Sequence, residues 1–282
     1  MPFLSGSRCV ESTPWDRDVP SNAREYDPMS GFAPGERRWI ERLGNLRNVI
    51  RQDVIARQLA GFVRPGMTVL DVGCGQGTQA MELASKGCSV TGVDPSQDLL
   101  GRCQALALEA GIAVELVPGQ IEELDEIISG RTFDVVCCHG VLMYLEDRGA
   151  ALKALADRLT PEGCLSVTFR NAHALAMRPG LRGNWVGALS AFKTDEYVNE
   201  LGLVARADRI EHVEQDLMAA GLELITWYGV RVFNDAIAVD VQEPGDEELR
   251  LLLEAEDRAG RTDPYRWMAS QLHVFARPSN GR

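Results

Sequence analysis

The chain has 282 residues, 45% of them hydrophobic, and a formal net charge of −12, which suits a large α/β domain with a buried core. No run approaches the ~18 uncharged apolar residues of a membrane span, and the N-terminus lacks the pattern of a secretory signal. The acidic total disfavours a surface covered in basic patches for nucleic acid, although a local patch remains compatible with it. Seven cysteines without C-x-x-C spacing are typical of small buried side chains, which predicts a reducing, cytoplasmic location.

The first 62 residues divide into two parts. Residues 1–38 are rich in Ser, Pro, Gly and mixed charges, and we predict a flexible arm there. From 39 to 62, apolar residues recur at spacings of mostly three to five, which predicts a helical N-terminal cap. We expect a single domain over 39–278.

Short apolar runs then alternate with helical segments. The predicted strands are 67–72, 89–93, 113–117, 133–138 and 164–169, and the predicted helices are 79–86, 97–109 and 150–159. Buried runs separated by helices indicate a parallel sheet covered on both faces. A helix at 209–220, a strand at 222–232, a helix at 246–259 and a strand at 271–276 complete the pattern. The predicted fold is therefore a doubly wound, Rossmann-like, mostly parallel seven-stranded sheet with an antiparallel edge hairpin.

The segment L-D-V-G-C-G-Q-G at 70–77 places three glycines directly after the first predicted strand. Its spacing departs from the dinucleotide fingerprint G-x-G-x-x-G, because Thr78 stands where the third glycine belongs. Asp94 ends the next strand, where a carboxylate can accept both hydroxyls of a ribose. Together these features predict a nucleoside site without a pyrophosphate; the alternative is a tight turn that binds nothing.

The glycine segment and the Asp94-Pro95-Ser96 that follows it resemble motifs I and II of the class I S-adenosylmethionine-dependent methyltransferases. The resemblance covers about 67–170 and includes the turn Thr160-Pro161-Glu162-Gly163, similar to the family's L-x-P-G-G. It implies S-adenosyl-L-methionine as methyl donor and S-adenosyl-L-homocysteine as product, with Gln120 beside the adenine. The cofactor-binding residues that it implies are Asp71, Gly73, Cys74, Gly75, Asp94, Pro95, Ser96, Gln120 and Ile121.

Further stretches resemble the bacterial tRNA 5-carboxymethoxyuridine methyltransferase family over roughly 40–278. They are G-N-L-R at 44–47, C-H-G-V-L-M-Y at 138–144, F-R-N-A-H-A-L-A-M-R-P-G-L-R-G-N-W at 169–185, Y-G-V-R-V-F-N-D at 228–235 and D-P-Y-R-W-M-A-S-Q-L-H-V-F-A-R-P at 263–278. This resemblance implies that Arg47 binds the carboxylate of the cofactor's methionine moiety and that His139 lines the cofactor site. It divides the domain into a cofactor half, 67–170, and an acceptor-binding half, 171–278.

The chemistry of the acceptor decides which residues the second half needs. A carboxylate, with a pKa of ~4, is ionised at neutral pH and needs an anion clamp, whereas a hydroxyl or amine calls for a base. Arginines beside amides and an aromatic ring suit such a clamp, although each arginine alone could be a solvated surface residue. No covalent or acid–base role is assigned, and no metal site is expected. The candidate acceptor-positioning residues are Arg170, Asn171, His173, Arg182, Asn184, Trp185 and Arg231.

One departure from the tRNA enzymes bears on the acceptor. Those enzymes carry a lysine-rich run after the Asn-His stretch, whereas here a single Lys193 stands among Asp195, Glu196 and Glu200. Phosphate recognition depends on clustered cations, so the sequence leaves several hypotheses open. The protein is a methyltransferase of a carboxymethoxyuridine in tRNA, a small-molecule methyltransferase that binds no RNA, or a cofactor-binding regulator without catalysis.

Overall fold

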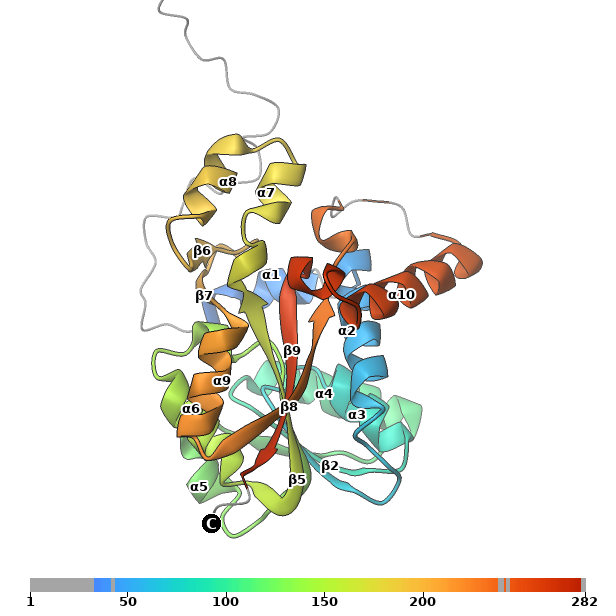
Figure 1. Cartoon of the computed structure of the whole chain (residues 1–282). Coiled ribbons are helices and arrows are strands. Elements are labelled where there is room, and N and C mark those ends of the chain that lie inside the picture. The colour runs from blue at the N-terminus through green and yellow to red at the C-terminus, as the bar shows by residue number, and fades with distance from the viewer. Residues whose placement is uncertain (1–32, 42–43, 238–240, 242–243, 280–282) are drawn as a thin grey trace, which may run out of the picture.

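One sheet runs through the computed structural model, which describes residues 33–41, 44–237, 241 and 244–279. Its parallel part comprises β1 (Thr68–Val72), β2 (Ser89–Asp94), β3 (Glu115–Pro118), β4 (Phe133–Cys138) and β5 (Leu159–Asn171). The antiparallel strand β9 (Gln271–Pro278) lies between β5 and β8 (Leu222–Val230). The resulting order, β3-β2-β1-β4-β5-β9-β8, confirms the predicted doubly wound sheet with an antiparallel edge (Figure 1).

Two short strands add to the seven that the sequence predicts. β6 (Glu196–Val198) and β7 (Val204–Asp208) form an antiparallel hairpin, and β7 joins β5 only at Arg170 and Asn171. The acidic, three-residue β6 has no apolar run that could have indicated a strand. β5 also begins earlier than expected, so the predicted turn at 160–163 becomes an irregularity where its register with β4 shifts.

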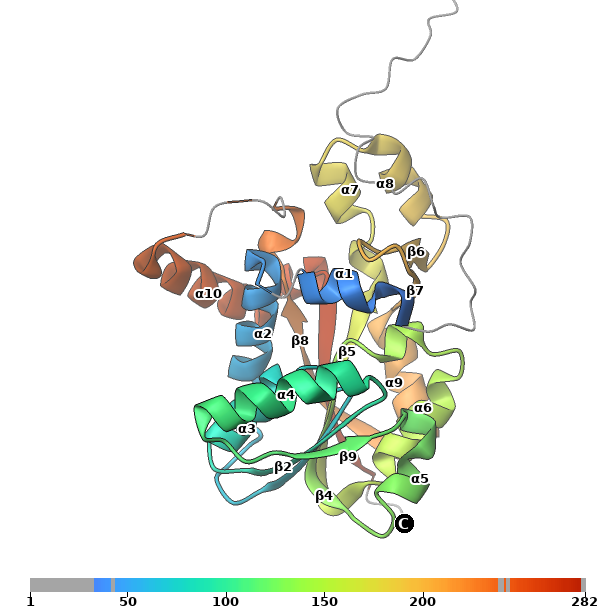
Figure 2. The ribbon, with the colours of Figure 1, turned by 180° about the vertical axis from the view of Figure 1, so that it is seen from behind.

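Helices cover both faces of the sheet (Figure 1 and Figure 2). One face carries α2 (Leu46–Leu59), α3 (Thr78–Ser85) and α10 (Asp246–Gly260), and the other carries α5 (Leu124–Ile127), α6 (Arg148–Ala156) and α9 (Ile210–Ala219). Consecutive β1 residues pack into the cores on opposite faces of the sheet: Val69 packs with Leu59 of α2, and Leu70 packs with Leu152 of α6. Strand side chains alternate between faces, so a strand buried on both sides reads as continuously apolar.

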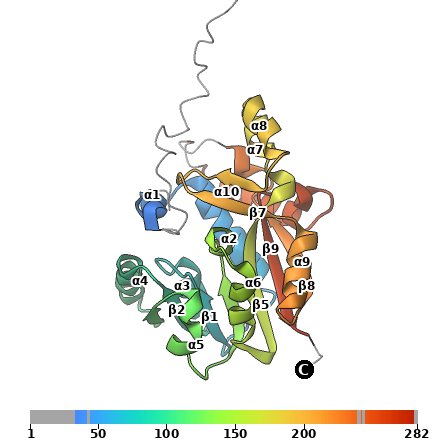
Figure 3. The ribbon, with the colours of Figure 1, turned by 90° about the vertical axis from the view of Figure 1, so that its left-hand side faces the viewer.

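Three further helices lie near one lateral edge of the sheet or beyond the carboxyl ends of its strands. α4 (Gln97–Ala110) packs beside β2 and β3, while α7 (Met177–Leu181) and α8 (Trp185–Ala191) project beyond the carboxyl end of β5 (Figure 3). Among the described helices, none combines the length and apolar content needed to span a bilayer. The short 3-10 helices are η3 (Ala33–Gly35), η4 (Ile121–Glu123), η5 (Leu142–Tyr144), η6 (Ala172–Ala174), η7 (Asn234–Ala236) and η8 (Tyr265–Met268).

The helical N-terminal cap that the sequence predicts over 39–62 consists of two helices in the structure. α1 (Glu36–Glu41) is separate from α2, because the Asn45 side chain accepts a hydrogen bond from Asn48 N at 2.9 Å and starts a new helix. Most of the predicted arm, residues 1–32, lies outside the described residues. Its last six residues form η3 and the beginning of α1.

Gly77 shows that the glycine loop is shaped by packing as well as by ligand access. Its φ is +81°, and a Cβ built there would lie 2.1 Å from Cys103 Sγ on α4. The third glycine of the loop therefore lets α3 begin against α4.

We expect Gly77→Ala to lower the free energy of unfolding by about 2–4 kcal/mol, because left-handed strain and overpacking both act there. Gly111→Ala is the matched control, since Gly111 has φ +67° but no atom within 4 Å of an added Cβ. Backbone strain alone should cost the control about 1–2 kcal/mol. Urea unfolding followed by circular dichroism measures both variants, and equal losses would refute the collision with Cys103.

Candidate active site

A cavity of about 710 Å³ lies at the carboxyl ends of the parallel strands. This is the edge where open α/β sheets bind their ligands. α1, α2, the loops after β1, β2 and β4, and the tip of the β6–β7 hairpin enclose it. The predicted residues that line it are Arg47, Gly73, Gly75, Asp94, Pro95, Ser96, Gln120, Ile121, His139, Arg170 and Arg231.

The glycine loop folds back onto the end of β2. Gly73 N and Cys74 N both donate to Val93 O, at 2.8 and 3.1 Å, and Gly73 has φ +74°. Cys74 is buried in this arrangement and does not line the cavity. Asp71 is also buried, and this burial, together with the charge of Asp94, raises its pKa to about 7. Asp71 and Cys74 therefore lie behind the loop, away from the cavity. The sequence predicts direct cofactor contacts for both.

Asp94 joins the two loops that flank the cavity. Its Oδ2 accepts a hydrogen bond from Gly75 N at 2.8 Å, and its Oδ1 accepts one from Ser96 N at 2.9 Å. Burial raises the pKa of Asp94, while these two N–H donors act against the rise. Each carboxylate oxygen keeps a second lone pair, and the side chain lines the cavity.

Apolar side chains surround this carboxylate. Trp39 of α1 lies over the glycine loop, since a Cβ added at Gly75 would be 3.1 Å from its ring. Leu99 and Ile121 also line this end of the cavity, and Gln120 precedes η4. A carboxylate within apolar walls provides both the polar and the stacking contacts that a nucleoside needs.

The far end of the cavity is dominated by arginines. Arg170, Arg178 and Arg231 converge on Asp235, and the Arg178 guanidinium binds it through two nitrogens at 2.7 and 2.9 Å. Burial alone would raise the pKa of Asp235, but the three arginines outweigh it and hold the pKa well below its usual range. The Arg170 guanidinium also lies 5.4 Å from the centre of the Tyr197 ring.

A second carboxylate, Glu200 from the β6–β7 hairpin, meets the other side of this cluster. Arg47 donates to both of its oxygens, at 2.9 and 2.7 Å, while Arg178 and Arg182 approach it at 3.3 and 3.7 Å. This arginine end of the cavity thus brings together five arginines and two carboxylates, Asp235 and Glu200. Arg47 is engaged by the chain's own carboxylate in this structure.

Five predicted acceptor-positioning residues lie outside the cavity lining, one of them Arg182, whose side chain approaches Glu200 instead. Asn171 is buried and donates to Ala269 O at 2.8 Å, and its Oδ1 accepts from His173 N. His173 itself faces an exposed carboxylate of α9. Asn184 caps α8, and Trp185 is 68% exposed on that helix. Amides satisfy backbone groups as readily as ligands, so the sequence pattern did not separate the two roles.

A buried hydrogen-bond chain leads to His139 from behind the sheet. Gln58 Nε2 donates to Gly229 O at 2.9 Å, so its Oε1 is the acceptor for His273 Nδ1 at 2.8 Å. Ser166 Oγ lies 2.8 Å from His273 Nε2 and 2.9 Å from His139 Nε2. Because burial keeps His273 neutral by lowering its pKa, the hydroxyl donates to His273 and accepts from His139 Nε2–H.

This chain defines the protonation state of His139. Burial and the nearby Arg51 charge lower its pKa to about 3, so the ring is neutral with its proton on Nε2. Its remaining lone pair, on Nδ1, is enclosed and has no hydrogen-bond partner within the described part of the chain. His139 is therefore suited to a positioning role and is a poor proton acceptor at neutral pH.

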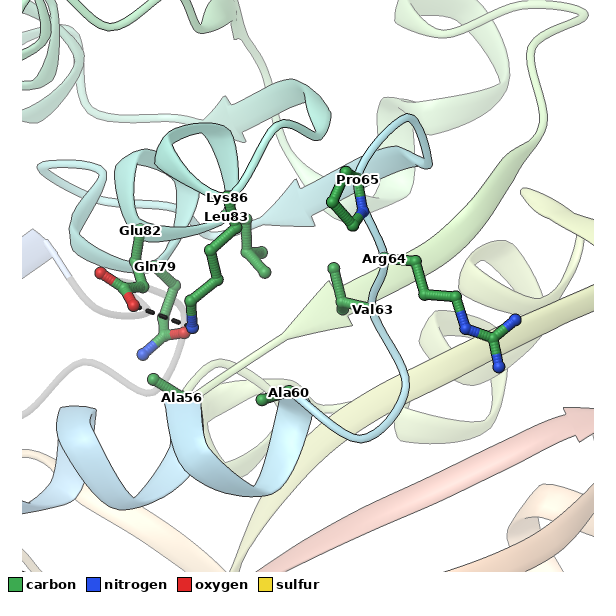
Figure 4. Close-up of a pocket in the computed structure, with 9 residues that line it drawn as sticks. All are labelled: Ala56, Ala60, Val63, Arg64, Pro65, Gln79, Glu82, Leu83 and Lys86. Carbon is green, nitrogen blue, oxygen red and sulfur yellow. Dashed lines mark ion pairs between the residues drawn. The ribbon is translucent and has the colours of Figure 1, made fainter.

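Sequence reasoning missed several residues of this site, including Arg51, Tyr144, Tyr197 and Glu200. No described residues form a group of three His, Cys, Asp or Glu placed to hold a metal ion. A second cavity of about 270 Å³ lies between α2 and α3, before β1 (Figure 4). In the wall of this cavity, Glu82 and Lys86 form an ion pair at 2.9 Å, four residues apart in the chain (Figure 4).

Known proteins are similar to this chain in architecture and in sequence. Residues 69–163 match the methyltransferase domain family. The tRNA 5-carboxymethoxyuridine methyltransferase of Escherichia coli strain K12 is 29% identical over 83% of this chain and 88% of its own length. A magnesium protoporphyrin IX methyltransferase from Synechocystis PCC 6803, solved with S-adenosylhomocysteine, superposes with a TM-score of 0.58 at 19% identity, covering 87% and 94% of the two chains.

The chain is an S-adenosylmethionine-dependent methyltransferase with the Rossmann-like fold of the structures that it resembles. A ubiquinone biosynthesis O-methyltransferase from Azorhizobium caulinodans is also similar, with 34% identity over 53% of this methyltransferase and 58% of its own length. Relatives whose names give different acceptors are therefore similar to this chain, so these similarities leave the acceptor undecided.

The cavity of the methyltransferase fits this cofactor. A side chain at Gly73 would collide with Val141, its added Cβ lying 2.3 Å from Val141 Cγ2, so the loop presents bare backbone at the cavity wall. We infer that Asp94 holds the ribose hydroxyls, with Gln120 and Ile121 beside the adenine.

We expect Asp94→Asn to weaken S-adenosylhomocysteine binding by at least about tenfold, because hydrogen bonds to a charged group contribute about 1.5–3 kcal/mol. Isothermal calorimetry measures the dissociation constant. Asp98→Asn is the control, since this exposed residue lies in the first turn of α4 and is not part of the cavity lining. Unchanged affinity in the Asp94 variant would remove the ribose assignment.

Proposed function

We propose that this methyltransferase esterifies a carboxylate of its acceptor. The observation that carries the proposal is the arginine end of the cavity, where five guanidiniums share two carboxylates inside a chain of net charge −12. This local excess of positive charge suits an anion. A guanidinium binds a carboxylate through paired, charge-assisted hydrogen bonds.

S-adenosylmethionine supplies a methyl group on a positively charged sulfur; the C–S electrons stay on sulfur as a carboxylate oxygen takes the methyl. The products are S-adenosylhomocysteine and a methyl ester. In this proposal the chain's residues orient both partners, since in-line displacement depends on alignment of the reacting atoms. Arg170 and Arg231 line the cavity and are the first candidates to hold the acceptor, together with Arg178, which also lines it and is not among the predicted acceptor-positioning residues.

The titratable groups near the arginines support an acceptor that is already ionised. The pKa of His139 is about 3, and the pKa of Glu200 lies below its ordinary value, so neither is a good base near pH 7. Burial raises the pKa of Tyr197, which keeps that phenol protonated. A hydroxyl or amine acceptor would require a base here, whereas a carboxylate requires none.

Carboxymethoxyuridine in tRNA is the first candidate acceptor. Similarity to the Escherichia coli enzyme of that name extends over 83% of this chain, so it includes most of residues 171–278. A carboxylate on the base suits the arginine cluster. The nucleotide would have to leave its stack to reach a cavity at the sheet edge.

A small-molecule carboxylic acid is the second candidate, favoured by the surface around the cavity. The chain contains only three lysines, and the β6–β7 hairpin is acidic. Phosphate backbones bind to clustered cations, and α7–α8 offers exposed apolar side chains beside the cavity instead. These side chains are Leu181, Trp185, Val186, Leu189 and Phe192.

We expect the product to be a methyl ester that releases methanol under mild alkali. The assay uses methyl-labelled S-adenosylmethionine with two substrates in parallel: tRNA from a strain lacking this gene, and a tRNA-free extract of small acids. Alkali-labile label in only one of them identifies the acceptor class. Alkali-stable transferred label would refute carboxylate methylation and leave methyltransferase activity in place.

Arg170→Gln tests the arginine cluster directly. We expect the acceptor KM to rise at least about tenfold, because a charge-assisted hydrogen bond contributes about 1.5–3 kcal/mol. The dissociation constant for S-adenosylhomocysteine should stay within about twofold, which also shows that the variant is folded. Arg277→Gln, in an exposed pair with Glu223, is the control. An unchanged acceptor KM would contradict the proposed clamp.

A further inference from the structure

Glu200 places a carboxylate of the protein inside the cluster that we propose to bind a carboxylate. Its two oxygens receive hydrogen bonds from Arg47 at 2.9 and 2.7 Å, and Arg178 approaches one of them at 3.3 Å. These arginines come from α2 and α7, whereas Glu200 comes from the turn between β6 and β7. Three separate segments therefore meet at this one side chain.

The negative charge of Glu200 balances part of the positive charge of the arginines around it. Burial would raise the pKa of Glu200, but Arg178 and Arg47 outweigh it and hold the pKa below its ordinary value, so Glu200 is ionised at neutral pH. The Arg47 side chain is 3% exposed and the Glu200 side chain is 32% exposed. The carboxylate is thus the partner that a ligand in the cavity can approach.

The segment that carries Glu200 has few connections to the sheet. β7 pairs with β5 at two positions, and β6 pairs only with β7. At the tip, Asn199 donates to Tyr144 Oη at 2.8 Å, and Arg38 donates to Leu201 O at 2.8 Å. Ala205 and Ala207 of β7 are buried, so movement is confined to the tip that carries Glu200.

We propose that Glu200 is an internal competitor that occupies a carboxylate subsite and is displaced when a ligand carboxylate binds. The subsite consists of Arg47, Arg178 and Arg182, and displacement moves the hairpin tip away from the cavity. The competing carboxylate belongs either to the methionine moiety of the cofactor or to the acceptor. The second case rests on the proposed function, whereas the first does not.

Competition makes a prediction that simple charge repulsion does not. Glu200→Asp keeps the charge but shortens the side chain, which weakens its bidentate contact with Arg47, whereas Glu200→Gln removes the charge. If Glu200 must be displaced, both variants bind the ligand more tightly, by about tenfold for Gln and less for Asp. If Glu200 stays in place and only repels the ligand, Gln alone tightens binding.

Calorimetry with three probes identifies the source of the carboxylate. S-adenosylhomocysteine carries the amino-acid carboxylate, 5′-methylthioadenosine lacks it, and benzoate added to the S-adenosylhomocysteine complex represents an acceptor carboxylate. Tighter S-adenosylhomocysteine with unchanged methylthioadenosine assigns the subsite to the cofactor. Tighter benzoate alone assigns it to the acceptor.

Glu196→Gln is the matched control, because this exposed residue lies on β6 of the same hairpin and is not part of the cavity lining. It should leave all three affinities unchanged. Weaker or unchanged binding of both carboxylate probes in the two Glu200 variants would overturn the proposal, as would tightening in Glu200→Gln alone. Ester formation by the native enzyme is measured separately, so either result leaves the proposed function standing.

Discussion

The arginine end of the cavity depends on one buried carboxylate, Asp235. Guanidinium groups removed from water must have counter-charges nearby, since an unpaired buried charge costs several kcal/mol. Asp235 meets this requirement for Arg170 at the end of β5, Arg178 on α7 and Arg231 after β8. Three segments distant in sequence are therefore held at one point, and their positions follow from charge more than from apolar contact.

The conformation of the loop that carries Asp235 also depends on this pairing of buried charges. Arg231 adopts φ +62°, a left-handed conformation that costs a non-glycine residue about 1–2 kcal/mol. Glu256 of α10 accepts hydrogen bonds from the backbone N–H groups of Val232, Phe233 and Asn234 at 2.7–3.0 Å. These bonds hold the loop in place, and the ion pair with Asp235 offsets the backbone strain of Arg231.

The two ends of the cavity differ in how far sequence could predict them. Gly73, Gly75 and Asp94 lie on consecutive strand–helix turns, and the parallel sheet brings such turns together at one edge, so spacing alone indicated their proximity. The arginine end has no such rule. Arg178 and Glu200 meet through a hairpin whose second strand pairs with β5 at only two positions.

For some residues, the residue type is compatible with two physical roles, and the sequence alone does not indicate which role the residue has. Glu200 stands in an acidic stretch that is typical of a solvated surface, and only tertiary contact with Arg47 shows that it turns inward. Asn171 and Asn45 satisfy backbone groups, one across the sheet and one at the start of α2. An amide in a motif predicts hydrogen bonding but does not identify the partner.

Charge in this protein is separated between surface and cavity, and this separation limits what can bind. At physiological ionic strength surface charges act over about 8 Å, so a ligand responds to the residues it touches. A phosphate backbone lying across the hairpin would meet Glu196 and exposed apolar side chains of α8, whereas a single carboxylate inside the cavity meets arginines. Under the proposed function, the cavity therefore selects for an anionic group small enough to enter it, and a polynucleotide would satisfy that condition only by inserting one base.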